Sequence, residues 1–152
     1  MATIVGVISD THGLLRPEAK EALRGSDLIL HAGDIGGREV LEELRRLAPL
    51  VAIRGNVDRG FWAEALPDTE VVKVASLHLY MLHDRGALAL EPGAAGFAAV
   101  IYGHSHVPAQ EIRRGVLFFN PGSAGPRRFK LPVTLGRLTI VDGDIQGELL
   151  TL

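Results

Sequence analysis

Aspartate, histidine and asparagine residues recur in short clusters along the first 106 residues of the chain. The clusters are Asp10-Thr11-His12, Gly33-Asp34, Gly55-Asn56-Val57-Asp58, His83-Asp84 and Gly103-His104-Ser105-His106. Carboxylate, imidazole and amide groups are nitrogen and oxygen ligands of divalent metal ions. The chain has no cysteine, so thiolate ligands, disulfides and a cysteine nucleophile are excluded. If these clusters meet in the folded protein, they predict a metal site built from nitrogen and oxygen ligands.

Two clusters hold a pair of candidate ligands separated by one residue. Asp10 and His12 form one pair, and His104 and His106 form the other. In an extended chain such residues point to the same side, so each pair can chelate one cation. Taken alone, Asp-Thr-His could cap a helix, and Gly-Asn could be an ordinary turn dipeptide. The ordered occurrence of all the clusters is what favours a metal site.

His31 and His78 differ from these histidines because both lie within apolar runs. We therefore expect them to be packed, or to support the ligands, and not to bind metal directly.

The clusters follow segments that are expected to be strands. The first part of the chain alternates between apolar runs typical of buried strands (4–8, 27–30 and 50–53) and helical patterns (from Pro17 towards Gly25, and Val40–Leu47). This alternation implies parallel strands joined by helical crossovers. The carboxyl ends of such strands form the usual ligand crevice, which is where the clusters fall.

The later part of the chain is expected to be mainly strands. The expected segments are a hairpin over 70–75 and 77–82, then 98–102, 116–119, 133–141 with an interruption at Gly136, and 144–150. With 152 residues, 47% of them hydrophobic, the chain is predicted to form one domain over 1–152. The predicted class is α/β, with two packed mixed sheets flanked by helices.

As an ordered series, the motifs resemble those of the calcineurin-like metallophosphoesterases, specifically their small single-domain branch of bacterial and archaeal phosphodiesterases. The series is D-x-H, G-D, G-N-x-D, a lone histidine, G-H-[ST]-H and N-P-G-S, the last standing here as Asn120-Pro121-Gly122-Ser123. The resemblance covers nearly the whole chain. It implies a four-layer α/β/β/α sandwich and hydrolysis of phosphate esters.

The resemblance also implies two divalent metal ions with shared ligands. The first ion would be held by Asp10, His12, Asp34 and His106, and the second by Asp34, Asn56, His83 and His104. Asp34 would bridge the ions, and a hydroxide held between them would attack the ester, which gives Asp34, Asn56 and His104 catalytic roles. Mn²⁺ is expected for activity, although Fe, Zn²⁺ and Ni²⁺ also suit these ligands.

Residues around the ligands are expected to position them or to contact the substrate. Asp58 would orient a ligand or its loop by hydrogen bonding, and the N-P-G-S turn would support the loop beside the metals. Arg127, with Arg128, could reach a substrate phosphate, or both could be solvated surface arginines. Val57 occupies the place where many superfamily phosphatases carry a leaving-group histidine, which favours activated phosphodiesters over alkyl phosphates.

The leading prediction is therefore a metal-dependent phosphodiesterase acting on a small phosphate ester. The alternatives are a phosphomonoesterase, a structural metal site without turnover, and a non-catalytic protein-binding scaffold like the retromer subunit of this fold. A scaffold with an altered metal site would have lost ligands, whereas all seven ligand positions are intact here.

Charge and hydropathy limit the expected partners and location. The net charge of −2 predicts no basic surface that would bind nucleic acid stably. No apolar run approaches the ~20 residues that span a bilayer, and the N-terminus lacks a signal-peptide pattern. We expect no membrane partner and a cytoplasmic protein, with a homo-oligomer left open.

Overall fold

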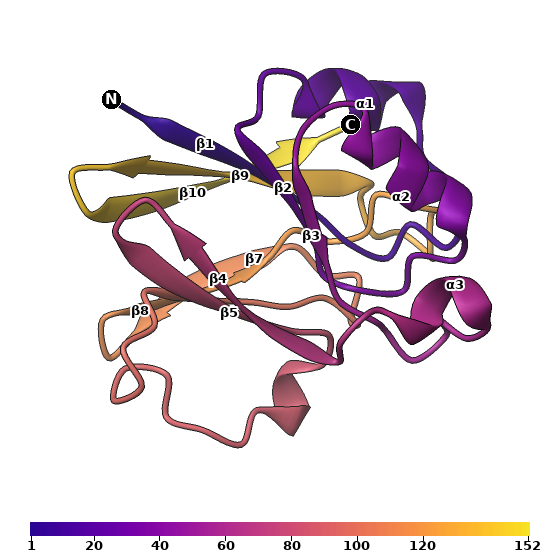
Figure 1. Cartoon of the computed structure of the whole chain (residues 1–152). Coiled ribbons are helices and arrows are strands. Elements are labelled where there is room, and N and C mark those ends of the chain that lie inside the picture. The colour runs from indigo at the N-terminus through magenta and orange to yellow at the C-terminus, as the bar shows by residue number, and fades with distance from the viewer.

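Two five-stranded sheets pack face to face, and the two longest helices, Pro17–Leu23 and Arg38–Arg45, lie on the outer side of one of them (Figure 1). The computed structural model describes residues 1–152. The elements in chain order are β1 Thr3–Ile8, α1 Pro17–Leu23, β2 Leu28–His31, α2 Arg38–Arg45, β3 Leu50–Ala52, α3 Phe61–Glu64, β4 Thr69–Val74, β5 Leu77–Leu82, a 3₁₀ helix Arg85–Ala87, β6 Ala99–Ile101, β7 Ala109–Arg113, β8 Val116–Asn120, β9 Thr134–Val141 and β10 Asp144–Thr151. The predicted class, two packed mixed sheets with flanking helices, is confirmed.

Each sheet contains three parallel strands, and these strands lead into the motifs. The strand order is β10-β9-β1-β2-β3 in the first sheet and β4-β5-β6-β8-β7 in the second. Strands β1, β2 and β3 are parallel in the first sheet, as are β5, β6 and β8 in the second. The remaining strands pair antiparallel, with β4, β7 and β10 at sheet edges and β9 between β10 and β1. Each parallel strand ends at one of the motifs, so the topology gathers segments that are distant in sequence.

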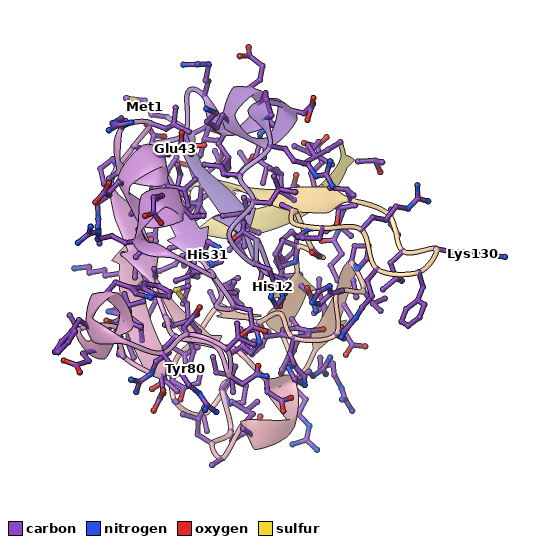
Figure 2. The ribbon with its side chains drawn as sticks, turned by 90° about the vertical axis from the view of Figure 1, so that its right-hand side faces the viewer. Met1, His12, His31, Glu43, Tyr80 and Lys130 are labelled. Atoms are coloured by element: carbon purple, nitrogen blue, oxygen red, sulfur yellow. The ribbon has the colours of Figure 1, made fainter.

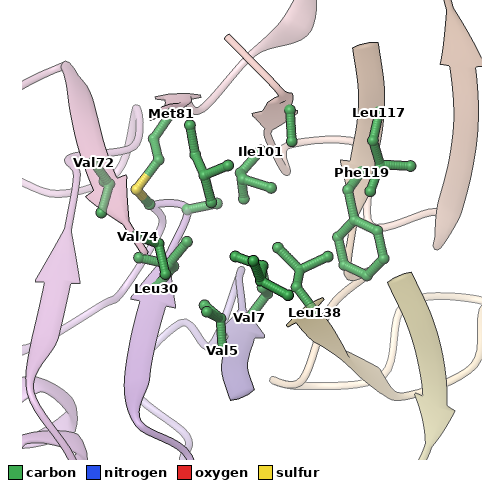
Figure 3. Packing of buried hydrophobic residues seen from close by; sticks show 14 of the residues in the cluster. Val5, Val7, Leu30, Val72, Val74, Met81, Ile101, Leu117, Phe119 and Leu138 are labelled. Atoms are coloured by element: carbon green, nitrogen blue, oxygen red, sulfur yellow. The ribbon is translucent and has the colours of Figure 1, made fainter. Parts of the chain in front are cut away.

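The main hydrophobic core lies between the two sheets (Figure 3). Side chains alternate along β1, so that Val5 and Val7 enter this core while Ile8 packs beneath the helices. The second cluster joins α1 and α2 to the outer face of the first sheet through residues such as Leu23 and Leu44. Both faces of β1 are therefore buried, which explains its continuous apolar sequence.

Phe119 of β8 fixes how the two sheets meet near β9 and β10. Its ring is fully buried and lies against the backbone of Gly136 in β9 and Gly147 in β10. A Cβ atom at either glycine would collide with the ring. The expected interruption of the strand at Gly136 is wrong, because β9 runs unbroken and pairs with strands on both sides. The glycine makes room for Phe119 instead.

Three short elements were not expected from the sequence. Strand β7 lies at a sheet edge and is largely exposed, so it has no alternation of apolar residues to mark it. Helix α3 and the 3₁₀ helix are each shorter than five residues.

The outer face of the second sheet carries a smaller hydrophobic cluster that includes Phe118, and the Arg85 guanidinium lies 4.2 Å from the Phe118 ring centroid. No helix in the structure has the length and apolar character needed to cross a membrane.

We predict that Gly136→Ala lowers the free energy of unfolding by about 1–3 kcal/mol, because the added methyl group forces the Phe119 ring to move. In the double variant Gly136→Ala/Phe119→Leu, the smaller side chain leaves room for the methyl group. In denaturant unfolding, the double variant should therefore lose less stability than the sum of the two single-variant losses, by at least ~0.5 kcal/mol. Strictly additive losses would contradict the proposed contact.

Candidate metal centre

The side chains predicted as ligands converge at the carboxyl ends of the parallel strands. Asp10 Oδ1 lies 3.4 Å from His106 Nε2, 3.8 Å from His83 Nε2 and 4.0 Å from His12 Nε2. Asp34 Oδ2 lies 3.2 Å from His83 Nε2 and 3.7 Å from His12 Nε2. These atoms come from the loops that follow β1, β2, β5 and β6, so both sheets contribute to one cluster.

The remaining two predicted ligands border this cluster. The Asn56 side chain lies within 3.3 Å of both Asp34 carboxylate oxygens and 3.2 Å from His83 Nε2. The ring of His104 meets that of His83 edge-on, with centroids 5.3 Å apart. Asn56, His83 and His104 also line one groove. The structure thus brings all seven predicted residues to one place.

The spacing of these atoms suits divalent metal ions. A ligand atom lies ~2.0–2.2 Å from a bound ion, so two ligands of the same ion are about 3–4 Å apart. Two triads come near this spacing, namely Asp10 with His12 and His106, and Asp10 with Asp34 and His83, each with ligand atoms within 4.8 Å of one another.

A buried carboxylate oxygen supports the same conclusion. Asp10 is fully buried, and its Oδ1 atom has no hydrogen-bond partner although three imidazole Nε2 atoms surround it. Buried polar atoms are normally paired, and an unpaired one costs ~1–3 kcal/mol or more when it is charged. A cation between Asp10 Oδ1 and these imidazoles would satisfy this oxygen.

Many of the predicted ligands have a left-handed backbone conformation. Positive φ angles occur at Asp10 (55°), His12 (46°), Asp34 (56°), His104 (73°) and His106 (65°). This conformation is uncommon outside glycine and concentrates at functional sites, where surrounding contacts must hold it. The strand ends therefore turn sharply to aim these side chains inward.

The other oxygen of Asp10 is fixed by hydrogen bonds. Ser9 Oγ donates to Asp10 Oδ2 at 2.8 Å, and the backbone N–H of His104 donates to the same oxygen at 3.2 Å. Ser9 is fully buried, and a Cβ atom at Gly103 would collide with its hydroxyl group. This close approach explains the glycine, and it leaves Oδ1 facing the histidines.

The N-P-G-S turn holds two of the ligand loops, as predicted. Asn120 Nδ2 donates to the carbonyl of Gly103 at 3.1 Å, on the loop that carries His104 and His106. Ser123 Oγ donates to the carbonyl of Asp10 at 2.9 Å. Both Asn120 and Ser123 are buried, so their role is structural.

Asp58 connects two further ligand loops. Its carboxylate accepts hydrogen bonds from the backbone N–H groups of Ile35 (3.1 Å), Gly36 (3.0 Å) and Gly55 (2.9 Å). These groups flank Asp34 and Asn56, and Asp58 itself is buried. The carboxylate therefore holds together the loops that carry Asp34 and Asn56, and its predicted role in orienting metal ligands stays a prediction.

Two histidines show how hydrogen bonds select a tautomer. His83 Nδ1 donates to the carbonyl of Ala32 at 2.7 Å, which leaves Nε2 towards the carboxylates. His31 Nδ1 accepts from the Gly33 N–H at 3.1 Å, while Nε2 lies 3.0 Å from Thr11 Oγ1. Because Thr11 donates its proton to the Ile35 carbonyl, His31 Nε2 is the donor to Thr11. His31 is a supporting histidine, as expected.

Burial sets the charge preferences of these groups. Complete burial lowers the pKa of His31 to about 3, which keeps its ring neutral. Burial also raises the pKa of the Asp10 carboxyl, against the opposing effects of His83, Ser9 and His106. Burial acts to raise the pKa of Asp34 too, but hydrogen bonds from His83 and the Val57 N–H bring it below its usual value. The cluster thus holds two buried carboxylates in need of positive charge.

The geometry leaves one predicted role undecided between two residues. The resemblance implies Asp34 as the bridge, yet Asp10 Oδ1 and Asp34 Oδ2 each face histidines of both predicted sets. Each carboxylate has its other oxygen engaged by backbone N–H groups. The bridging role of Asp34 stays a prediction.

Several contributing residues were not singled out from the sequence. Ser9 binds Asp10, Thr11 binds His31 and Arg16 binds Gly125. The sequence offered only the position of Ser9 and Thr11 next to Asp10 as a signal, and none for Arg16. Arg127 and Arg128 are exposed and line a groove beside His12 and His106. The side chain of Val57 is half exposed beside Asn56.

Comparison with known proteins gives one consistent family. The model of the calcineurin-like phosphoesterase superfamily domain matches residues 4–143. A probable metallophosphoesterase of Methanothermobacter thermautotrophicus is 35% identical over an alignment of 156 positions, which covers 93% of this chain and 87% of the relative.

Solved structures with the same fold include an enzyme and a sorting protein. An archaeal phosphodiesterase has a TM-score of 0.81 and 25% identity, over 97% of this chain and 100% of that one. Vps29 of Entamoeba histolytica in complex with Zn²⁺ has a TM-score of 0.73 and 26% identity, over 98% of this chain and 99% of that one.

We predict that Asp58→Asn weakens metal binding about 10–100-fold. An asparagine side chain has one acceptor oxygen where aspartate has two. At least one of the three backbone N–H groups therefore loses its hydrogen-bond acceptor. Titration of the metal-stripped protein with Mn²⁺ measures the effect. Asp142→Asn, the same change in an exposed turn, is the control and should bind as the wild type does. Equal affinities for the two variants would contradict the role of Asp58.

Proposed function

Because the chain belongs to the calcineurin-like phosphoesterase superfamily, we propose that it hydrolyses phosphodiesters with two divalent metal ions held by its clustered ligands. Family membership supports a metal-dependent phosphoesterase, and the proposal adds the diester and the number of ions. The observation that carries it is the buried cluster in which Asp10 Oδ1 lies unpartnered among three imidazoles. Such a cluster is costly unless cations occupy it.

The ligands divide into two sets around the carboxylates. Asp10, His12, Asp34 and His106 would hold one ion, and Asp34, Asn56, His83 and His104 the other. When bound, the ions supply Lewis-acid activation of water and neutralise charge on the phosphoryl group. Mn²⁺ is proposed as the active metal, and Fe, Zn²⁺ and Ni²⁺ fit the same nitrogen and oxygen ligands.

The cluster is buried on one side and open on the other. Asp10, Asp34, His83 and His106 are buried, whereas His104 is exposed and 31% of the His12 side chain is accessible. A phosphate ester can therefore approach from the side of His12 and His104. Asn56 is a neutral ligand, so it adds no negative charge that would repel the incoming phosphate.

The environment of Val57 favours diesters with acidic leaving groups. Its half-exposed side chain beside Asn56 offers no proton to a departing alkoxide. Without a positioned acid, a poor leaving group is expected to lose ~10²–10⁴-fold in rate, and an acidic alcohol much less. The similarity to an archaeal phosphodiesterase supports the same choice over a phosphomonoesterase.

A non-catalytic scaffold is the alternative from another class, in view of the similarity to Vps29. The complete ligand set and the open side of the cluster support turnover instead. The cytoplasmic location and the oligomeric state stay predictions.

The decisive assay is hydrolysis of bis(p-nitrophenyl) phosphate by metal-stripped protein, with and without added Mn²⁺. We expect activity only with the metal. Asp34→Asn should reduce kcat/KM at least ~100-fold, since even residues outside the ligand set cost ~10–100-fold. Asp142→Asn, which makes the same change in an exposed turn, should retain wild-type activity. Metal-independent hydrolysis, or full activity of a folded Asp34→Asn variant, would overturn the proposal.

A further inference from the structure

Three grooves border the metal centre, and the two that are lined by its histidines differ in charge. One is lined by His12, His106, Pro126, Arg127 and Arg128 and has a volume of about 370 Å³. The other, of similar volume, contains Asn56, His83 and His104 together with Arg54, Asp68 and Asp84. A diester bound at the metals has two substituents, so each groove is positioned to receive one of them.

The first groove is positive because nothing in it balances its arginines. Arg127 and Arg128 are both exposed, and no carboxylate lines the groove. In the second groove, Arg54 forms a 3.1 Å ion pair with Asp68, and Asp84 adds a further negative charge. An anionic substituent therefore favours the first groove and an uncharged one the second.

The segment that carries the arginine pair is anchored directly on the ligand loop. Gly125 packs against the carbonyl groups of Asp10 and Thr11 so closely that a Cβ atom would collide with them. Arg16 Nη2 donates to the carbonyl of Gly125 at 3.2 Å. Beyond this anchor the chain projects outwards, with Lys130 at the outer end (Figure 2). The pair thus begins two residues from a point fixed against the metal ligands.

We propose that the substrate carries a second phosphate group beside the scissile diester, and that Arg127 and Arg128 bind this phosphate. The inference rests on the proposed diesterase function and specifies its substrate class. Guanidinium groups match phosphate oxygens with paired hydrogen bonds, which makes two adjacent arginines a selective site. The groove has the size of a small-ligand site, and the chain has a net charge of −2, so the substrate is a small molecule and not a nucleic-acid strand.

Equilibrium binding tests the site without turnover. The Mn²⁺-loaded protein is titrated with thymidine 5′-monophosphate and with thymidine 3′,5′-bisphosphate, and the two dissociation constants are compared. The wild type should bind the bisphosphate about tenfold tighter or more, as expected for a charged hydrogen-bonded contact. In Arg127→Ala/Arg128→Ala this preference should fall to within about twofold, since the contact is lost.

A matched control separates the site from the overall charge. Arg45→Ala/Arg46→Ala removes the same charge from an exposed pair at the end of α2. It should keep the wild-type preference. Absence of a preference in the wild type, or its loss in both double variants, would overturn the inference.

Kinetics extends the test to the reaction. Thymidine 5′-(p-nitrophenyl phosphate) is compared with the same ester carrying a 3′-phosphate, which has the same leaving group. The wild type should have the higher kcat/KM for the ester with the 3′-phosphate. The ratio of this value to that of the plain ester should fall about tenfold in Arg127→Ala/Arg128→Ala. An unchanged ratio in that variant would overturn the inference, as would a higher kcat/KM for a thymidine decamer than for the small ester.

Failure of the proposed function has a different signature. If neither ester is hydrolysed with Mn²⁺ while the bisphosphate preference holds and depends on the arginine pair, the anion site stands and the diesterase proposal falls.

Discussion

The burial of two carboxylates, Asp10 and Asp34, at the junction of the two sheets is the constraint on which this structure depends. Water would stabilise both charges in the unfolded chain, and their mutual repulsion adds to the cost of burial. The protein meets part of this cost with the Ser9 hydroxyl group, backbone N–H groups and imidazoles. Asp10 Oδ1 still lacks a hydrogen-bond partner, and bound cations would supply the positive charge that it needs.

The topology follows from the need to bring these groups together. Each sheet contributes parallel strands whose carboxyl ends meet along one edge of the sandwich. The chain then turns through left-handed conformations at several of the ligands, and such strain persists only where neighbours hold it. Asp58 and Asn120 provide that hold, because each joins loops that carry ligands. The centre is thus a product of backbone geometry.

The sequence predicted the central strands and all seven converging residues, because buried parallel strands read as apolar runs and the motifs mark their ends. It did not predict β7, whose exposed edge position leaves no apolar pattern. Gly136 was misread as a break, since the Phe119 ring that requires it comes from the other sheet. Local sequence also cannot distinguish Asp10 from Asp34 as the shared ligand, because that depends on where two distant loops place four carboxylate oxygens.

The proposed centre holds two ions that share one carboxylate, and anomalous X-ray scattering from crystals grown with Mn²⁺ tests this arrangement most directly. We expect two anomalous peaks about 3.5–4 Å apart, the spacing of two-metal hydrolytic centres, with the Asp34 carboxylate between them. A single peak would contradict the two-ion centre. Two peaks joined by Asp10 in place of Asp34 would contradict the assignment of the bridge.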